Sequence, residues 1–109
     1  MSISNIVSLP AWRMGFYDVE ALALWVQGAR PGDQATYFLG SLAAARDWEN
    51  PSVPRHDLRR INEIADGALE FERRGLVALV QERAGADAFR YIIIRSGRLS
   101  PVRRHATRA

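Results

Sequence analysis

Apolar residues recur at helical intervals in two segments of the chain. The first segment, residues 18–29, opens with Asp18, whose side chain can cap a helix, and carries Val19, Leu22 and Val26 at intervals of three and four residues. The second, residues 57–74, repeats its apolar positions at the same spacing and is followed by Gly75, a residue type common just after a helix end. We expect a helix in each segment, and the second should be the longest of the chain.

Three shorter segments have the composition of β-strands. Residues 34–39 (QATYFL), 76–82 and 89–95 are rich in β-branched and aromatic side chains. Residues 83–88 (RAGADA) have the length and the glycine of a hairpin turn, so we expect the last two segments to pair. Because an isolated hairpin is only marginally stable, it needs residues 34–39 as a third strand and the long helix as a cover.

The remaining segments are shorter and less regular. Residues 41–48 (SLAAARDW) favour a short helix, because alanine and leucine dominate and Ser41 can cap it, whereas Pro51 and Pro54 predict a loop. Residues 1–16 show no clear period. We expect them to form an arm in which three apolar side chains pack back onto the domain, namely Trp12, Met14 and Phe16.

A chain of 109 residues is long enough for one domain with a sizeable core. The pattern predicts an α+β fold in which helices pack on a small three-stranded antiparallel sheet with a C-terminal β-hairpin. We expect this domain to span residues 18–95. An N-terminal arm, residues 1–17, would precede it, and a disordered basic tail, residues 96–109, would follow it.

Composition narrows the possible chemistry. The chain has no cysteine and two histidines, each beside arginine, so we expect neither disulfides nor a metal site. No window approaches the roughly 18 uninterrupted apolar residues of a membrane-spanning helix. The first residues also lack the pattern of a secretory signal. We therefore expect a soluble, cytoplasmic protein that does not bind a membrane.

The sequence has no pattern typical of catalysis. Its serines have no arrangement of histidine and carboxylate that would activate a nucleophile. Residues 28–33 (GARPGD) contain two glycines but no lysine followed by serine or threonine, so they predict a helix end and not a phosphate-binding loop. We expect a protein that is not an enzyme and that needs no cofactor.

Charge is divided unevenly along the chain. Residues 1–87 contain nine Arg and twelve Asp or Glu, a net charge of −3, whereas residues 88–109 contain six Arg and no acid, a net charge of +6. Every Lys or Arg position holds arginine, whose planar guanidinium suits phosphates, carboxylates and base edges. A basic segment at one end of a chain favours an interaction with nucleic acid.

The order of the expected elements over residues 18–95 is helix, strand, short helix, long helix, hairpin, which resembles the order in winged helix-turn-helix domains. The phrase FERRGLVALVQER resembles their junction between the last helix and the wing. More narrowly, ARPGDQATYFLGSLAAARD together with GLVALVQERAGADAFRYIIIRS resembles small uncharacterised proteins of proteobacteria and their phages. That group carries no established activity, so any functional implication comes from winged-helix domains in general.

The resemblance implies a small DNA-binding protein, similar to transcription regulators and encoded by a phage or a bacterium. In winged-helix domains the third helix enters the major groove of double-stranded DNA by its N-terminal residues, and the wing contacts flanking phosphates. On this sequence the start of the helix supplies Arg55, His56, Arg59 and Arg60. The wing supplies Arg83 and Arg90, and the tail supplies Arg98, Arg103 and Arg104. We expect a homodimer, because one such domain makes only a small contact with DNA.

A second hypothesis stays open. Glu63, Asp66 and Glu70 follow the basic start of the same long helix and would repel DNA from the rest of it. Protein interfaces are rich in arginine and tryptophan, and this small domain has three tryptophans, Trp12, Trp25 and Trp48. The alternative is a protein–protein interaction module, such as a phage-encoded inhibitor of a host protein complex (anti-defence type), that does not bind nucleic acid.

Overall fold

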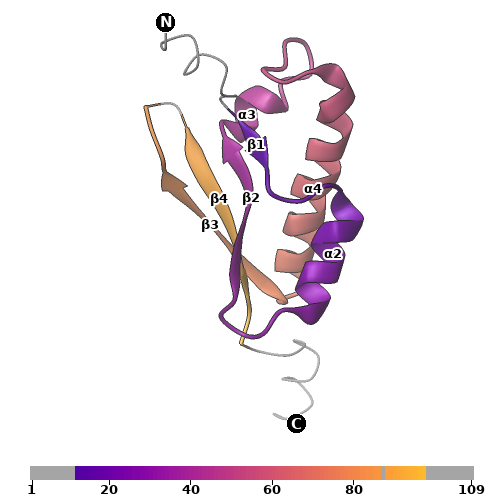
Figure 1. Ribbon diagram of the computed structural model, residues 1–109, viewed down its shortest axis with the longest axis vertical. Helices are drawn as coiled ribbons and strands as arrows, with labels where there is room; N and C mark the ends of the chain where they lie inside the picture. Colours follow the sequence, from indigo (N-terminus) through magenta and orange to yellow (C-terminus); the bar gives the residue numbers. More distant parts are fainter. Residues whose placement is uncertain (1–11, 87, 98–109) are drawn as a thin grey trace, which may run out of the picture.

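The structure is a computed structural model that describes residues 12–86 and 88–97 (Figure 1). These residues form four strands and three helices, which is an α+β fold. In chain order the elements are β1 (Arg13–Met14), α2 (Val19–Gly28), β2 (Gln34–Gly40), α3 (Leu42–Ala45), α4 (Arg55–Arg73), β3 (Val77–Arg83) and β4 (Phe89–Arg95).

The strands form one antiparallel sheet in the order β1-β2-β4-β3. The predicted hairpin is confirmed, because Val80 of β3 pairs with Ile92 of β4, and β4 pairs in turn with β2. The prediction of three strands is wrong, because β1 adds a fourth beside β2. A strand of two residues is too short to produce an alternating pattern, so the sequence carried no signal for it.

Side-chain packing holds β1 in place. Trp12, just before β1, stacks on Phe38 of β2 with ring centroids 6.4 Å apart, and the Gly15 N–H donates to the Tyr37 carbonyl oxygen at 3.0 Å. Trp12, Met14 and Phe16 all pack against the core, as predicted. The described part of the predicted arm, residues 12–17, therefore packs on the domain and contributes a strand to its sheet.

A β-bulge in β2 turns two consecutive aromatic side chains toward the core. Thr36 pairs with Ile92 and Phe38 pairs with Tyr91, which leaves Tyr37 as the extra residue. Both aromatic rings lie about 6 Å from the Tyr91 ring, and Tyr37 and Phe38 are 6% and 2% exposed. Strict alternation would have placed one of the two on the opposite face of the sheet.

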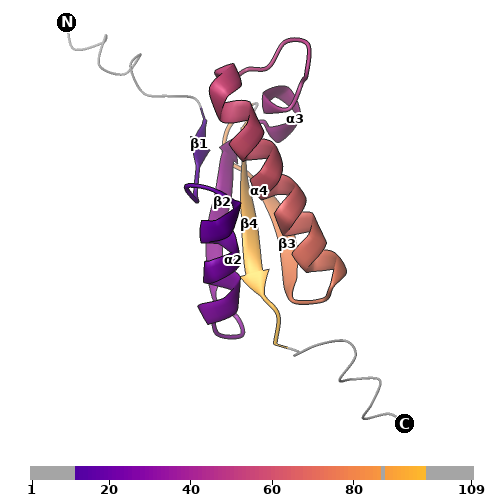
Figure 2. The same ribbon diagram turned by 90° about the vertical axis from the view of Figure 1, so that its right-hand side faces the viewer.

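Helices α2 and α4 lie side by side on one face of the sheet (Figure 2). The buried side of α4 consists of Leu58, Ile61, Ile64, Ala65 and Ala68, as the sequence pattern indicated, but Leu69, which the same pattern placed on this side, is 52% exposed. Gly67 permits the close approach of α2, since a Cβ atom there would lie 2.8 Å from the Val19 Cγ2 atom. The other face of the sheet is covered by no helix of the described residues.

The helix ends follow the predicted caps. Asp18 Oδ1 accepts a hydrogen bond from the Ala21 N–H at 2.9 Å, and Gly75, with φ of 80°, follows the end of α4. Ser41 caps α3, which is nevertheless shorter than predicted. It ends early because the Asp47 carboxylate accepts hydrogen bonds from the Glu49 and Asn50 N–H groups and so forms a turn.

Candidate nucleic-acid interface

The start of α4 and the β3–β4 turn lie at the same end of the long axis of the molecule (Figures 1 and 2). Six of the nine predicted DNA-contacting residues belong to these two elements. Arg98, Arg103 and Arg104 lie outside the described residues. Because β4 runs from the turn toward the opposite end, the end of β4 lies far from the start of α4 (Figure 1).

Three basic side chains project into solvent from the first turns of α4. The Arg59 side chain is 86% exposed, with its Nε 3.3 Å from a Glu63 carboxylate oxygen, and the His56 side chain is 82% exposed. Arg55 is exposed as well, and its guanidinium donates two long hydrogen bonds to the carbonyl oxygens of Trp48 and Glu49, at 3.3 and 3.4 Å. The His56 Nε2 atom also lies 3.5 Å from Asp57 Oδ2, so all three exposed side chains have protein contacts, each of 3.3 Å or longer.

Arg60 is built into the fold instead. Its side chain is 32% exposed and donates to Asp57 Oδ1 at 3.1 Å, and its guanidinium carbon lies 4.7 Å from the centroid of the Tyr17 ring. The Arg60 Nε is buried and has no hydrogen-bond partner within the described residues. Arg60 thus joins α4 to the segment before α2, and its position does not favour a groove contact.

The two hairpin arginines differ in their surroundings. Arg83 donates to the carbonyl oxygens of Gly85 and Ala86, at 3.3 and 3.0 Å, and its guanidinium carbon lies 5.4 Å from the centroid of the Phe89 ring. It therefore braces the turn. Arg90 forms an ion pair of 2.8 Å with Glu82 across the hairpin, so its charge is neutralised locally.

The acidic residues further along α4 are paired with arginines. Asp66 contacts Arg46 at 2.7 Å, and Glu70 contacts both Arg73 and Arg74, at 2.6 and 3.0 Å. Hydrogen bonds from Arg73 and Arg74 hold the pKa of Glu70 below its usual value. The acidic face expected from the sequence is therefore largely compensated, which removes much of the predicted repulsion of DNA.

A hollow of about 380 Å³ adjoins the basic start of α4. It is lined by Trp48, Arg55, Leu58, Arg59, Asn62, Glu63 and Asp66. Trp48 is 70% exposed. We call the set formed by Trp48, Arg55, His56 and Arg59 the α4 start surface. An exposed indole that lines one hollow with two arginines can stack on a planar group while the arginines bind its negative charges.

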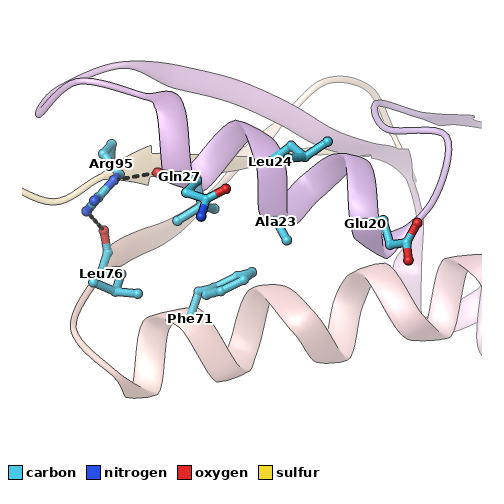
Figure 3. A pocket seen from close by; sticks show the side chains of 8 residues that line it. Glu20, Ala23, Leu24, Gln27, Phe71, Leu76 and Arg95 are labelled. Carbon is cyan, nitrogen blue, oxygen red and sulfur yellow. Dashed lines mark hydrogen bonds between the residues drawn. The ribbon is translucent and has the colours of Figure 1, made fainter.

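A larger hollow, of about 610 Å³, separates α2 from the end of α4 (Figure 3). Ala23, Leu24 and Phe71 give it an apolar wall, and Arg95 stands at one end. The Arg95 guanidinium donates to the carbonyl oxygens of Val26 and Leu76, at 2.8 and 2.9 Å. These bonds satisfy carbonyl groups at the end of α2 and at the start of the hairpin, which gives Arg95 a structural role.

Two further observations concern metal ligands and membrane spans. Within residues 12–86 and 88–97, no three His, Asp or Glu side chains gather as metal ligands would. Over the same ranges, every helix is too short or too polar to cross a bilayer.

We compared the chain with protein families, curated proteins and solved structures. No protein family, curated protein or solved structure was found to match this chain.

Proposed function

We propose that this chain is a small DNA-binding protein of the winged-helix type, similar to transcription regulators, and that the α4 start surface contacts double-stranded DNA. The observation that carries the proposal is the exposure of Arg55, His56 and Arg59 in the first turns of α4, at the same end of the molecule as the β3–β4 turn. A helix start with basic side chains beside a hairpin can place cations on a groove and on its flanking phosphates.

The topology supports this proposal, with two departures. The strand order β2-β4-β3, with the hairpin paired to the strand before α3, matches the wing arrangement that the resemblance implies. However, residues 46–54 separate α3 from α4, and a helix-turn-helix has a turn of about 3 to 4 residues. Strand β1 is a further addition. The contact with DNA therefore depends on α4 and on loop 46–54 more than on α3.

The charge balance makes the position of the cations important. The described residues contain eleven Arg and eleven Asp or Glu, so they carry no net charge, whereas residues 98–109 contain four Arg and no acid. Attraction to phosphates must come from local groups on the α4 start surface and from residues 98–109. Each phosphate that such a group neutralises releases counterions, which makes binding strongly dependent on salt.

A titration of a fluorescent mixed-sequence duplex at several salt concentrations tests this function. We compare the full chain with Arg55→Ala/Arg59→Ala and with a matched control, Arg73→Ala/Arg74→Ala, which removes two exposed arginines from the other end of α4. We expect the negative slope of log K against log salt to become shallower by about 2 in the first variant and to stay unchanged in the control. A chain that ends at Ser96 measures the joint contribution of the four arginines of residues 97–109, namely Arg98, Arg103, Arg104 and Arg108.

Two results would contradict the proposal. One is the absence of duplex binding by the full chain at low salt. The other is an equal loss in both double variants, because it would mean that overall charge, and not the α4 start surface, determines binding.

A second candidate function is a protein-interaction module. It is favoured by Trp48, which is 70% exposed beside Arg55 and Arg59, since tryptophan and arginine dominate interface hot spots. This function predicts that the full chain binds no duplex at any salt concentration. It also predicts that Trp48→Ala leaves the free energy of unfolding within about 0.5 kcal/mol of the wild-type value, as expected for a surface side chain.

A further inference from the structure

The two edges of the sheet are unequal. One edge is β1, with two residues, and the other is β3, with seven residues from Val77 to Arg83. Strand β3 pairs with β4 over its whole length without a register shift. No described segment pairs with its outer side. The strand contains no proline and no bulge, which are two of the devices by which proteins protect an edge.

Hydrogen bonds at the two ends of the hairpin establish which backbone groups face outward. The Ser96 N–H donates to the Leu76 carbonyl oxygen at 2.9 Å, and the Ala84 N–H donates to the Ala88 carbonyl oxygen at 2.9 Å. Bonded and non-bonded pairs alternate in an antiparallel ladder, so Ala78, Val80 and Glu82 are bonded to β4. It follows that the N–H and C=O groups of the residues between them point away from the sheet, in particular those of Leu79 and Gln81.

Exposed apolar side chains flank this edge on both sides. Val80, on the open face of the sheet, is 45% exposed, and Leu69, on α4, is 52% exposed. Both line one hollow of about 290 Å³ beside β3, together with Leu79 and Gln81. An edge with free backbone groups and apolar side chains above and below it is suited to another β-strand.

We propose that β3 pairs antiparallel with β3 of a second copy of this chain, with Val80 on the two-fold axis. Several antiparallel registers with two-fold symmetry would let the outward-facing N–H and C=O groups of the two strands form hydrogen bonds. The register centred on Val80, the middle residue of β3, pairs every residue from Val77 to Arg83. Leu79 then exchanges hydrogen bonds with Gln81 of the second copy, and Ala78 lies opposite Glu82. The two four-stranded sheets become one continuous sheet, and no like charges stand directly opposite each other.

The register explains why Val80 is exposed in a single chain. In an antiparallel ladder the non-bonded pairs are the closest, with Cα atoms about 4.5 Å apart, so the two Val80 side chains bury each other on the axis. The self-complementary register favours a second copy over an unrelated strand, because an isologous contact needs the same patch on both partners. This inference does not depend on DNA binding.

The chain lacks cysteine, so single cysteine variants of the full chain test the register directly. Under mild oxidation, Val80→Cys should form a disulfide-linked dimer at least about tenfold faster than Ala78→Cys or Glu82→Cys alone, because its Cα atoms fall within disulfide range across the axis. An equimolar mixture of Ala78→Cys and Glu82→Cys should form the mixed dimer. Equal crosslinking of all three single variants would overturn the proposal, since it would indicate random collision.

A second measurement tests the pairing without new thiols. Sedimentation of the unmodified full chain should reveal a dimer, and Gln81→Pro should convert it to a folded monomer, because it removes an outward N–H and leaves the bonds to β4 intact. Should proline disturb the hairpin, Val80→Arg is the second variant, since it sets two cations face to face on the axis. A wild-type chain that is monomeric at about 100 µM, or a dimer that survives Val80→Arg, would overturn the proposal.

Discussion

The replacement of Gly15 by alanine tests the part of the fold that the sequence did not reveal. A Cβ atom at position 15 would lie 1.7 Å from the Thr36 carbonyl oxygen and 2.8 Å from its carbonyl carbon. Both are backbone atoms of the central part of β2, so no side-chain rotation can relieve the overlap. We expect Gly15→Ala to detach β1 from β2 while the rest of the sheet and the helices remain.

The free energy of unfolding should fall because the segment that detaches loses its packing against the core. Trp12, Met14 and Phe16 are each half-buried against the core, and the Gly15 N–H loses its bond to Tyr37. Full burial of such a side chain stabilises a fold by about 1.5 to 3 kcal/mol. At about half of that for each of three side chains, the free energy of unfolding should fall by about 2 to 4 kcal/mol.

Urea unfolding, followed by tryptophan fluorescence and far-ultraviolet circular dichroism, measures this loss. Gly28→Ala is the matched control, because position 28 ends α2 and has no atom within 4 Å of a new Cβ, so this change should stabilise the protein by up to about 1 kcal/mol. If Gly15→Ala unfolds within about 0.5 kcal/mol of the wild-type protein, the close contact between Gly15 and β2 does not exist in solution and β1 is wrongly placed.

Three further substitutions test other contacts. Burial raises the pKa of Tyr37 from 10.0 to about 12, and Tyr91 and Glu72 add to the shift. Between pH 10 and 12 the folded state therefore keeps a proton that the unfolded state loses, so the free energy of unfolding should fall by up to about 2 to 3 kcal/mol across this window. Tyr37→Phe should remove that part of the fall in urea titrations, and an unchanged slope would contradict the assignment. Arg95→Met should lower the free energy of unfolding by about 1 to 3 kcal/mol, because the Val26 carbonyl oxygen loses its side-chain donor and the Leu76 carbonyl oxygen keeps the Ser96 N–H but loses the guanidinium; a thermal melt that matches the wild type would contradict this role. Arg60→Met should destabilise the fold by about 1 to 3 kcal/mol through Asp57 and Tyr17, whereas Arg59→Met should change stability by less than about 0.5 kcal/mol. Equal effects in calorimetry would show that the two arginines do not differ as described.

The longer elements could be predicted because their patterns extend over several turns or several strand residues. The periodic apolar positions of α2 and α4 predicted helices, and the two β-branched and aromatic segments of the hairpin predicted strands. Asp18 and Gly75 marked helix ends. Strand β1 could not be found in this way, since its two residues depend on the contact between Trp12 and Phe38. The bulge at Tyr37 was equally hidden, because its cause is the pairing with β4.

The candidate site was predicted in part for a similar reason. Exposure of Arg59 follows from its place on the polar side of the predicted helix, which spacing reveals, whereas Arg55 lies before residue 57, where that helix was expected to begin, and is the first residue of α4. The partial burial of Arg60 depends on Tyr17, a residue of a distant segment. The compensation of the acidic side chains of α4 depends partly on Arg46, which follows α3. Contacts between distant segments decided both outcomes, and a single sequence contains no periodic signal for them.

The two proposed surfaces should act independently, because antiparallel pairing reverses the direction of one copy relative to the other. The hairpin turn and the start of α4 lie at one end of each chain (Figure 1), so a dimer joined through β3 presents its two α4 start surfaces at opposite ends. A short duplex bound at one surface cannot reach the other. Gln81→Pro, which separates the copies, should therefore leave the affinity per chain for a short duplex within about twofold of the wild-type value, with the same salt slope. A loss of tenfold or more in that titration would mean that both copies share one duplex, which the pairing of β3 with itself does not permit.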